Sequence, residues 1–165
     1  MSEAREDPVL LALARLRRPA LDRAVAAFSR LGDYGVGWVV AGAALALALG
    51  RPGRALAFAA LVWGTLGLNY AVKRVVRKER PAHGGAAPPL IQAPASPSFP
   101  SSHAAMSAAA AFGLSELVPG AWPLFATLAV LMALSRLYLA VHDTVDVVAG
   151  ALLGSAVGAA YLLLA

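Results

Sequence analysis

Five long apolar runs with almost no charge constrain this chain more than any other feature. They cover residues 34–50, 55–72, 103–118, 121–141 and 147–165. A bilayer core about 30 Å thick needs roughly 20 apolar residues per spanning helix, and these runs approach that length. Only 14% of the residues are charged, against about 25% in a typical soluble domain. The sequence predicts an all-α integral membrane bundle of about five transmembrane helices, forming a single domain over residues 1–165.

Two segments differ from the other runs. Residues 103–118 are rich in alanine and only weakly apolar, so this helix is expected inside the bundle. Within the N-terminal segment 1–33, Leu21, Val25 and Phe28 recur at helical spacing over residues 19–31, and Gly32 follows as a C-cap. We expect an amphipathic helix in the membrane interface. A surface helix leading into the first span is the alternative.

The distribution of basic residues predicts the orientation of the chain. With helices alternating in direction, all of the 14 Lys and Arg residues except Arg51 and Arg54 fall on one side. The positive-inside rule then places this side, with the polar motifs, in the cytoplasm of a multi-pass cell-membrane protein. The net charge of +5 is explained by this bias and by the site below, so no nucleic-acid partner is expected.

Three polar groups on that side stand out, because ionisable residues at membrane depth are functional candidates. They are K-R-V-V-R-K-E-R-P at 73–81, P-S-S-H at 100–103 and S-R-L-Y-L-A-V-H-D-T-V-D at 135–146. Taken singly, they could be interfacial anchors, N-caps, or a snorkelling arginine. Their convergence on one membrane face favours a site.

These groups supply the chemistry of phosphoryl transfer. Lys73, Arg80 and Arg136 offer positive charge to a tetrahedral dianion. Ser101 and Ser102 open a helix, and helix N-termini bind anions.

Two histidines complete the chemistry. His142 and Asp146 are four residues apart and share a helix face, so the carboxylate can orient the imidazole for nucleophilic attack. His103 can protonate a leaving group. No metal or other cofactor is required, and the chain lacks a carboxylate cluster to hold a metal.

The order and spacing of the three groups resemble the signature of the type 2 phosphatidic-acid phosphatase superfamily, which reads K-x6-R-P, P-S-G-H and S-R-x5-H-x3-D. The match spans residues 73–146. The resemblance implies that His142 becomes a phosphohistidine, that Asp146 orients it, and that His103 serves as acid and then base. It also implies that the phosphoryl oxygens are held by Lys73, Arg80, Ser101, the Ser102 backbone N–H and Arg136.

The sequence departs from that pattern in a few places. Ser102 stands where the family usually has glycine and would be strained if the position needs a positive φ. Asp143 follows the nucleophile and is expected to face solvent. His83 matches no motif position, and membrane members of the family commonly have six spans rather than five.

The resemblance predicts a membrane-embedded phosphatase that hydrolyses a phosphomonoester or diphosphate of a lipid, either a glycerolipid or a polyprenyl-linked compound. A polyprenyl-linked sugar phosphate such as decaprenylphosphoryl phosphoribose fits the cytoplasmic orientation. A phosphotransferase using the same phosphohistidine and a non-enzymatic transport or assembly protein are the alternatives. A vanadate haloperoxidase is disfavoured by the small size of the chain. The glycines at 150, 154 and 158 favour close helix packing within the chain but also allow a homodimer.

Overall fold

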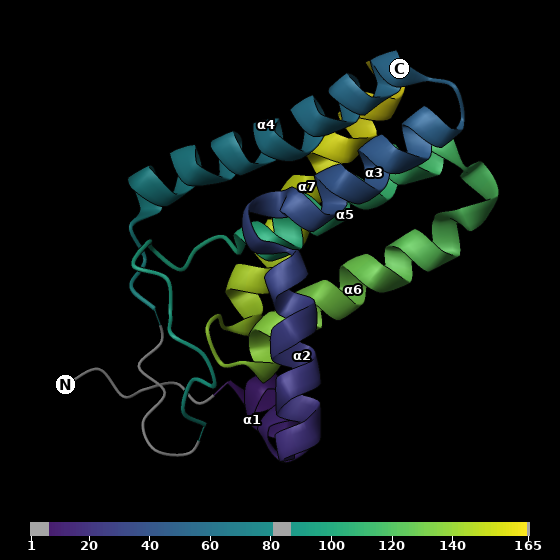
Figure 1. Ribbon diagram of the computed structural model, residues 1–165. Helices are drawn as coiled ribbons and strands as arrows, with labels where there is room; N and C mark the ends of the chain where they lie inside the picture. Colours follow the sequence, from purple (N-terminus) through teal and green to yellow (C-terminus); the bar gives the residue numbers. More distant parts are fainter. Residues whose placement is uncertain (1–6, 81–86, 165) are drawn as a thin grey trace.

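The regular structure of the protein is entirely helical over the residues that the computed structural model describes, 7–80 and 87–164 (Figure 1). The predicted all-α class is confirmed. The elements are α1 (Pro8–Ala14), α2 (Pro19–Leu31), η1 (Asp33–Gly35), α3 (Val36–Ala48), α4 (Pro52–Val76), α5 (Ser102–Leu117), η2 (Pro119–Ala121), α6 (Trp122–Tyr138) and α7 (Thr144–Leu164).

Helix α5 forms the centre of the bundle, as its weak apolarity predicted. It packs most extensively against α7 and α6 and also contacts α4. Its alanines allow close approach, and most of its residues are buried. On α7, Gly150 faces the Ser101 carbonyl, Gly154 faces Ala105 and Gly158 faces Phe112. The glycine stripe therefore packs within the chain, and it gives no support to the predicted homodimer.

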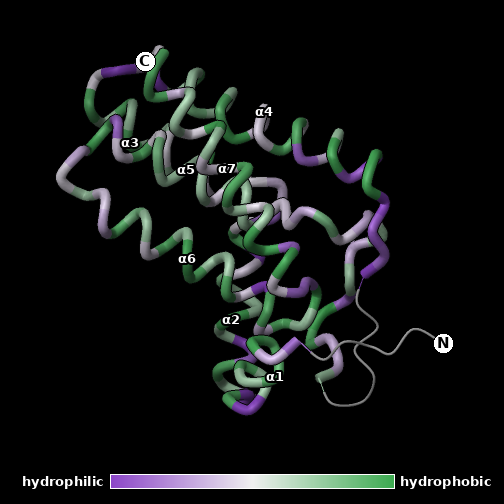
Figure 2. The backbone as a smooth tube through the Cα atoms, turned by 180° about the vertical axis from the view of Figure 1, so that it is seen from behind, coloured by the Kyte–Doolittle hydropathy of each residue, from purple (hydrophilic) through white to green (hydrophobic). Residues whose placement is uncertain are grey.

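Three helical segments in the described part of the chain are long and apolar enough to cross a membrane: α4, Pro119–Tyr138 and α7. A fourth is possible if α2 and Asp33–Ala48, which are bent by 47°, form one span. Figure 2 shows α6 and α7 mostly apolar along their length, with hydrophilic residues at the ends of the bundle. Helices α3 and α5 are shorter than a full span, so the expected number of five spans remains a prediction.

The bend between α2 and α3 brings the N-terminal segment against the bundle. Tyr34 (φ 52°) and Gly35 (φ 71°) both adopt left-handed conformations. Glycine tolerates this geometry and tyrosine does not favour it. Trp63 on α4 donates from Nε1 to the Tyr34 carbonyl at 3.2 Å, which helps to hold the turn. Helix α2 has the predicted bounds and ends at Gly32, and it packs along α6. Its location in the membrane interface stays a prediction.

Helix α1 was not anticipated from the sequence. Asp7 caps it by accepting from the backbone N–H groups of Val9 and Leu10 at 3.0 and 3.2 Å. The same carboxylate accepts from the backbone N–H of Thr144 at 2.6 Å. This contact ties the N-terminal segment to the start of α7.

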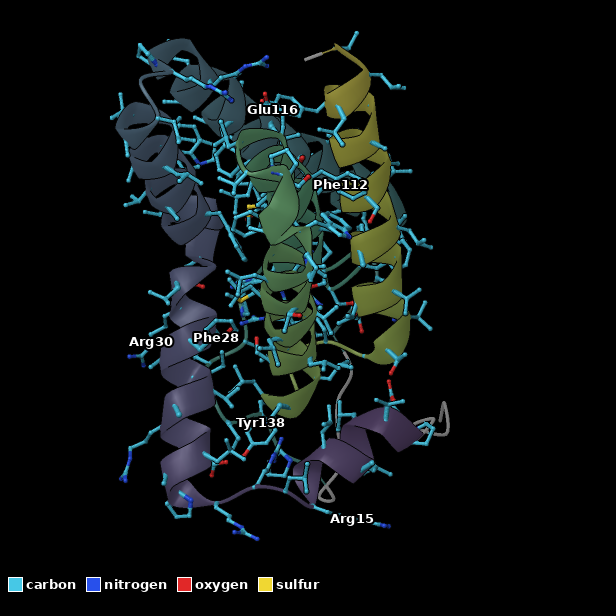
Figure 3. All side chains as sticks on the ribbon, turned by 90° about the vertical axis from the view of Figure 1, so that its right-hand side faces the viewer. Arg15, Phe28, Arg30, Phe112, Glu116 and Tyr138 are labelled. Carbon is cyan, nitrogen blue, oxygen red and sulfur yellow. The ribbon has the colours of Figure 1, made fainter. Side chains whose placement is uncertain are left out.

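The motif-bearing ends of the helices gather at one end of the bundle. The C-terminal ends of α4 and α6 lie there with the N-terminal ends of α5 and α7. Figure 3 shows Tyr138 toward this end and Glu116 toward the other, where Glu116 pairs with Arg54 at 3.4 Å. Residues 87–101, which lead into α5, lie at the site end, and the backbone N–H of Ser98 donates to the Lys78 carbonyl at 2.9 Å.

Candidate active site

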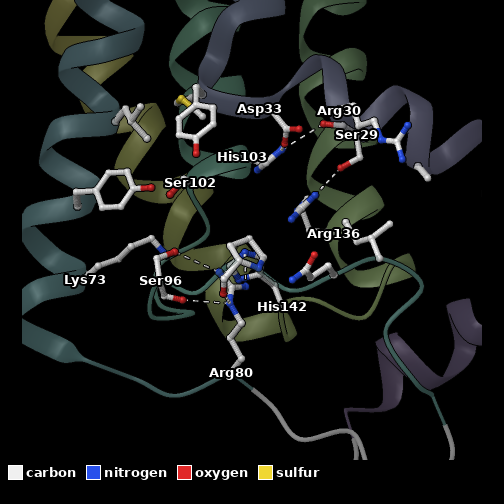
Figure 4. Close-up of a pocket in the computed structure, with 18 residues that line it drawn as sticks. Ser29, Arg30, Asp33, Lys73, Arg80, Ser96, Ser102, His103, Arg136 and His142 are labelled. Carbon is white, nitrogen blue, oxygen red and sulfur yellow. Dashed lines mark hydrogen bonds and ion pairs between the residues drawn. The ribbon is translucent and has the colours of Figure 1, made fainter.

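A polar pocket of about 380 Å³ opens at this end of the bundle (Figure 4). Six of the eight predicted site residues line it: Lys73, Arg80, Ser102, His103, Arg136 and His142. The other two, Ser101 and Asp146, are fully buried behind the lining. The structure therefore brings together residues from four helices and two loops that are separated by up to 73 positions, as the motifs predicted.

The buried His142 ring lies between the carboxylate of Asp146 and the guanidinium of Arg80. Its Nδ1 lies 3.3 Å from Asp146 Oδ2, and its Nε2 lies 3.4 Å from Arg80 Nη1. Ala140 (φ 56°), two residues after the end of α6, adopts a left-handed conformation, and the chain then turns to place His142 before α7. His142 and Asp146 therefore do not share a helix face as predicted, although their side chains still meet. Because a carboxylate accepts and a guanidinium only donates, Nδ1 carries the proton and Nε2 presents a lone pair.

The environment of His142 favours the neutral ring. Burial lowers the pKa of His142 to about 3, against the hydrogen bond to Asp146, which raises it. The nearby charges of Arg136 and Arg80 lower this pKa further. A neutral imidazole with an unprotonated Nε2 is the state that a nitrogen nucleophile requires.

The three predicted cations of the pocket are each held by oxygen acceptors. Lys73 Nζ donates to the carbonyls of Pro97 and Ser98 at 2.6 and 3.2 Å. Arg80 Nη1 donates to the Val141 carbonyl at 2.7 Å, next to His142.

Arg136, the third cation, is 2% exposed and donates from Nη1 to Ser29 Oγ at 2.5 Å. Within the described residues, its Nε and the Ser101 hydroxyl are buried without a hydrogen-bond partner. Such donors suit a phosphoryl group, which carries several acceptor oxygens.

The two serines of the second motif have separate roles in the structure. Ser101 occupies the N-cap of α5, but its side chain makes no capping bond, and its backbone N–H donates to the Asp146 carbonyl at 2.9 Å. Ser102 is the first residue of α5 and does not have a positive φ, so the serine is accommodated without the strain considered above. Its hydroxyl donates to Asn69 Oδ1 at 2.6 Å.

His103 enters the pocket from the opposite side to His142 (Figure 4). Its Nε2 lies 3.2 Å from the Ser29 carbonyl and 3.2 Å from Asp33 Oδ1. Ser29 and Asp33 come from α2 and η1, outside the signature, and no spacing in the sequence identifies them.

Lys78 and Asp143 correct two readings of the sequence. Asp143 was expected to face solvent, but its carboxylate is partly buried and lies 2.5 Å from Lys78 Nζ. It also accepts from the backbone N–H of Asp146 at 2.9 Å. Lys78, one of the residues considered as simple anchors, lies 2.8 Å from Asp146 Oδ1. Arg74 and Arg77, by contrast, are exposed.

Burial alone would lower the pKa of Lys78, but its hydrogen bonds to Asp143 and Asp146 raise it. Lys78 therefore remains a cation beside Asp146, the partner of His142. His83, which had no assigned role, lies outside the described residues.

Comparison with known proteins identifies the family. Residues 52–165 match the PAP2 superfamily, which covers more than half of the chain. The chain belongs to the PAP2 superfamily. This confirms the resemblance read from the three motifs, and the chain is accordingly a phosphoric ester hydrolase and a membrane protein.

Two relatives are phosphatases of a polyprenyl-linked sugar phosphate. The chain is 40% identical over 150 residues to decaprenylphosphoryl-5-phosphoribose phosphatase of Mycolicibacterium smegmatis, covering 88% of this chain and 81% of the relative. It is 35% identical over 147 residues to the Mycobacterium tuberculosis protein of the same name, with the same coverage.

Solved structures share the fold. The PAP2-type phosphatidylglycerolphosphate phosphatase from Bacillus subtilis superposes with a TM-score of 0.79 at 24% identity, covering 96% of this chain and 83% of that one. LpxE of Aquifex aeolicus gives a TM-score of 0.76 at 25% identity, and the superposition covers 93% of this chain and 92% of LpxE. A bacterial vanadium-dependent iodoperoxidase gives 0.73 at 16% identity, and this chain covers only 48% of it.

Proposed function

We propose that the protein is a lipid phosphate phosphatase that removes the phosphomonoester of a polyprenyl-linked sugar through a phosphohistidine, without a metal. The observation that carries this proposal is the position of His142, which lines one pocket together with Lys73, Arg80 and Arg136 and whose Nε2 lies 3.4 Å from Arg80 Nη1. The names of the 40% and 35% identical relatives support the substrate class. A pocket of about 380 Å³ is of the size that binds small ligands, so it can hold a phosphate with part of a sugar.

In the first step, the lone pair of His142 Nε2 attacks phosphorus and forms an N–P bond. The bond between phosphorus and the ester oxygen of the sugar breaks, and its electron pair leaves with that oxygen. His103 supplies a proton to the departing alkoxide, and Asp146 stabilises the positive charge that develops on His142. Lys73, Arg80 and Arg136 balance the charge on the equatorial oxygens, with Ser101 and the Ser102 N–H as further donors.

In the second step, a water molecule attacks the phosphohistidine. His103, now neutral, accepts a proton from that water as the new P–O bond forms. The N–P bond breaks, its electron pair returns to His142, and inorganic phosphate is released. The chemistry is positioning and electrostatic stabilisation, as is general for phosphoryl transfer.

An apolar groove of about 570 Å³ provides a place for the lipid chain. Its lining comes from α2, α3 and α6 and includes Phe28, Val40, Ala41 and Leu128. Arg30 lines both this groove and the polar pocket, so the two cavities adjoin at this side chain. A polyprenyl tail seated in the groove places the phosphorylated headgroup toward His142.

The basic bias supports an orientation with the pocket toward the cytoplasm. The chain has no cysteine, so single cysteines can report the sidedness. Ala93→Cys is on the exposed loop at the pocket end, and Gly53→Cys is near the start of α4, where an added Cβ meets no atom within 4 Å. We expect a membrane-impermeant maleimide to label Gly53→Cys in intact cells and to spare Ala93→Cys. Labelling of Ala93→Cys alone would reverse the orientation.

The function is tested by phosphate release from a panel of lipid phosphates in detergent, with and without EDTA. We expect wild type to release inorganic phosphate equally in both, His142→Asn to be inactive, and an acid-labile phosphoprotein to be trapped only in wild type. Arg74→Met, a change at an exposed cation one residue from Lys73, serves as the matched control. Activity in His142→Asn, or its loss with EDTA, would contradict the mechanism, and transfer of phosphate to an alcohol in place of water would indicate a phosphotransferase.

A further inference from the structure

The bend between α2 and α3 contacts two residues of the signature although it lies outside residues 52–165, which carry the family match. Ser29 accepts through its main-chain carbonyl from His103 and through its hydroxyl from Arg136. Asp33 Oδ1 lies 3.2 Å from the same nitrogen of His103. Figure 4 shows these side chains grouped on one wall of the pocket.

We propose that Asp33 and Ser29 are positioning residues of the phosphatase reaction: Asp33 orients His103 for proton transfer, and Ser29 holds Arg136 against the phosphoryl group. This inference rests on the function proposed above. It makes His103–Asp33 a second histidine–aspartate pair, placed across the pocket from His142–Asp146.

The charges around the pocket support a specific role for Asp33. Among the described residues that line the pocket, Asp33 is the one carboxylate, and it stands among four cations, Arg30, Lys73, Arg80 and Arg136. A carboxylate at a phosphate site repels the substrate, so its presence needs a compensating use. Asp146 is already engaged by His142 and Lys78, which leaves Asp33 as the counter-charge for a protonated His103.

The contacts of His103 also fix the orientation of its ring. With Nε2 held by Asp33 and the Ser29 carbonyl, the ring has a defined rotation, and Nδ1 is the nitrogen left for the phosphoryl group. Gly32 packs directly on the ring, because a Cβ at this position would lie 2.7 Å from His103 Cδ2. The left-handed turn at Tyr34 and Gly35 directs α3 away and leaves Asp33 beside His103.

A plain surface ion pair is the competing explanation, since the Asp33 side chain is 55% exposed and exposed pairs contribute little to stability. The two explanations differ in how the reaction depends on the leaving group. An alkoxide needs a proton to leave, whereas 4-nitrophenolate is a weak base and departs without one. A residue that serves the proton donor therefore affects only the first kind of substrate in kcat/KM, which reports the steps up to departure.

The experiment compares decyl phosphate with 4-nitrophenyl phosphate in detergent. For Asp33→Asn we expect kcat/KM on decyl phosphate to fall about 10- to 100-fold, within the range of general-acid effects, and the value on 4-nitrophenyl phosphate to change by less than about threefold. The double variant Asp33→Asn/His103→Asn should be no slower than His103→Asn, since both residues serve one proton transfer. Asp22→Asn is the matched control: Asp22 lies on α2, the helix that precedes Asp33, and accepts from the Tyr138 hydroxyl, a bond that asparagine can keep.

Ser29→Ala tests the proposed role of Ser29 in holding Arg136, separately from the role of Asp33. It removes the hydroxyl from Arg136 but keeps the main-chain carbonyl for His103. We expect a rise in KM of about tenfold, the order expected for a hydrogen bond to a charged group, with the dependence on leaving group unchanged. An Asp33→Asn variant equally impaired on both substrates, or unimpaired on both, overturns the role of Asp33. If that happens while His142→Asn is inactive and His103→Asn is slowed on decyl phosphate, the proposed function stands; activity in His142→Asn removes the function itself.

Discussion

Lys78 Nζ lies 2.8 Å from Asp146 Oδ1, on the opposite oxygen of the carboxylate from the one that faces His142 Nδ1. Asp146 is fully buried, and the neutral imidazole offers it a hydrogen bond but no charge. Lys78 supplies that charge, and a buried carboxylate without such a partner is strongly unfavourable. The lysine therefore stabilises Asp146 on the side opposite His142, and it is not among the residues that line the pocket.

Lys78→Met is expected to reduce kcat about tenfold or more, because Asp146 loses a charged hydrogen-bond partner and no longer holds His142 firmly. Lys78→Arg should recover part of the activity by keeping the cation. The measurement is phosphate release together with the melting temperature in detergent. Arg74→Met, on the same stretch but exposed, controls for loss of basic charge at the membrane surface. Equal activity of Lys78→Met and wild type would show that Asp146 needs no counter-charge.

The low pKa of His142 predicts how stability depends on pH. The folded protein keeps His142 neutral down to about pH 3, whereas the unfolded chain protonates it near the ordinary value of 6.5. The unfolded state thus binds the extra proton between these limits, and the contribution to stability is lost as pH falls below 6.5, by about 2 kcal/mol between pH 7 and pH 5.

Melting temperatures at pH 7 and pH 5 check this prediction. Between pH 7 and pH 5, the melting temperature of wild type should fall more than that of His142→Gln, which cannot titrate at this position. The difference between the two falls is the contribution of the His142 imidazole. An equal loss in both proteins would mean that His142 is already protonated or exposed in the folded state.

The apolar groove predicts selectivity for chain length. Ala41→Trp places a large side chain in the groove and is expected to raise KM for long-chain lipid phosphates several-fold, because the chain loses apolar contact area. A short-chain phosphate that occupies only the polar pocket should be hydrolysed as before. Ala160→Trp, an exposed alanine on α7, is the matched control. A uniform effect on long and short substrates would place the lipid chain elsewhere.

Gly32→Ala tests the packing of the bend on the site. The new methyl group would lie 2.7 Å from His103 Cδ2 and 2.9 Å from Met132 Sδ. The thioether can move aside but the ring is held by two acceptors, so we expect overpacking of about 1–3 kcal/mol and a shifted His103. Phosphate release should fall more than it does for Gly53→Ala, where no atom lies near the added Cβ. Full activity of Gly32→Ala would show that the ring position is not critical.

The signature residues were predictable because their chemistry is unusual at membrane depth and their spacing is fixed. Lys73, His103 and Arg136 carry signals that hardly depend on the rest of the fold. Asp33 carried none: a single acidic residue between an amphipathic helix and an apolar run is ordinary, and its contact with His103 comes from the long-range packing of α2 and η1.

The helix boundaries also divide into those that a local sequence pattern predicts and those that depend on distant contacts. The apolar runs located α4 and α7 closely, since lipid-facing and core-facing residues are both apolar there. Helix α1 depends on the bonds of Asp7 to its first turn and to Thr144, which is distant in sequence and gives no local pattern. The contact of Lys78 with Asp146 could not be predicted, because Lys78 belongs to a cluster of basic residues and such a cluster at a membrane surface usually serves as an anchor.

Some contacts of this site are made by backbone groups. The Ser101 N–H binds the Asp146 carbonyl, and the Ser29 carbonyl accepts from His103. No change of side chain deletes either of these groups, apart from proline at position 101. Scanning mutagenesis will therefore under-report how the ends of α2, α5 and α7 are joined, and an alanine that leaves activity intact at position 29 or 101 would not show that the position is dispensable. Replacing single backbone amides by esters would reach what alanine cannot.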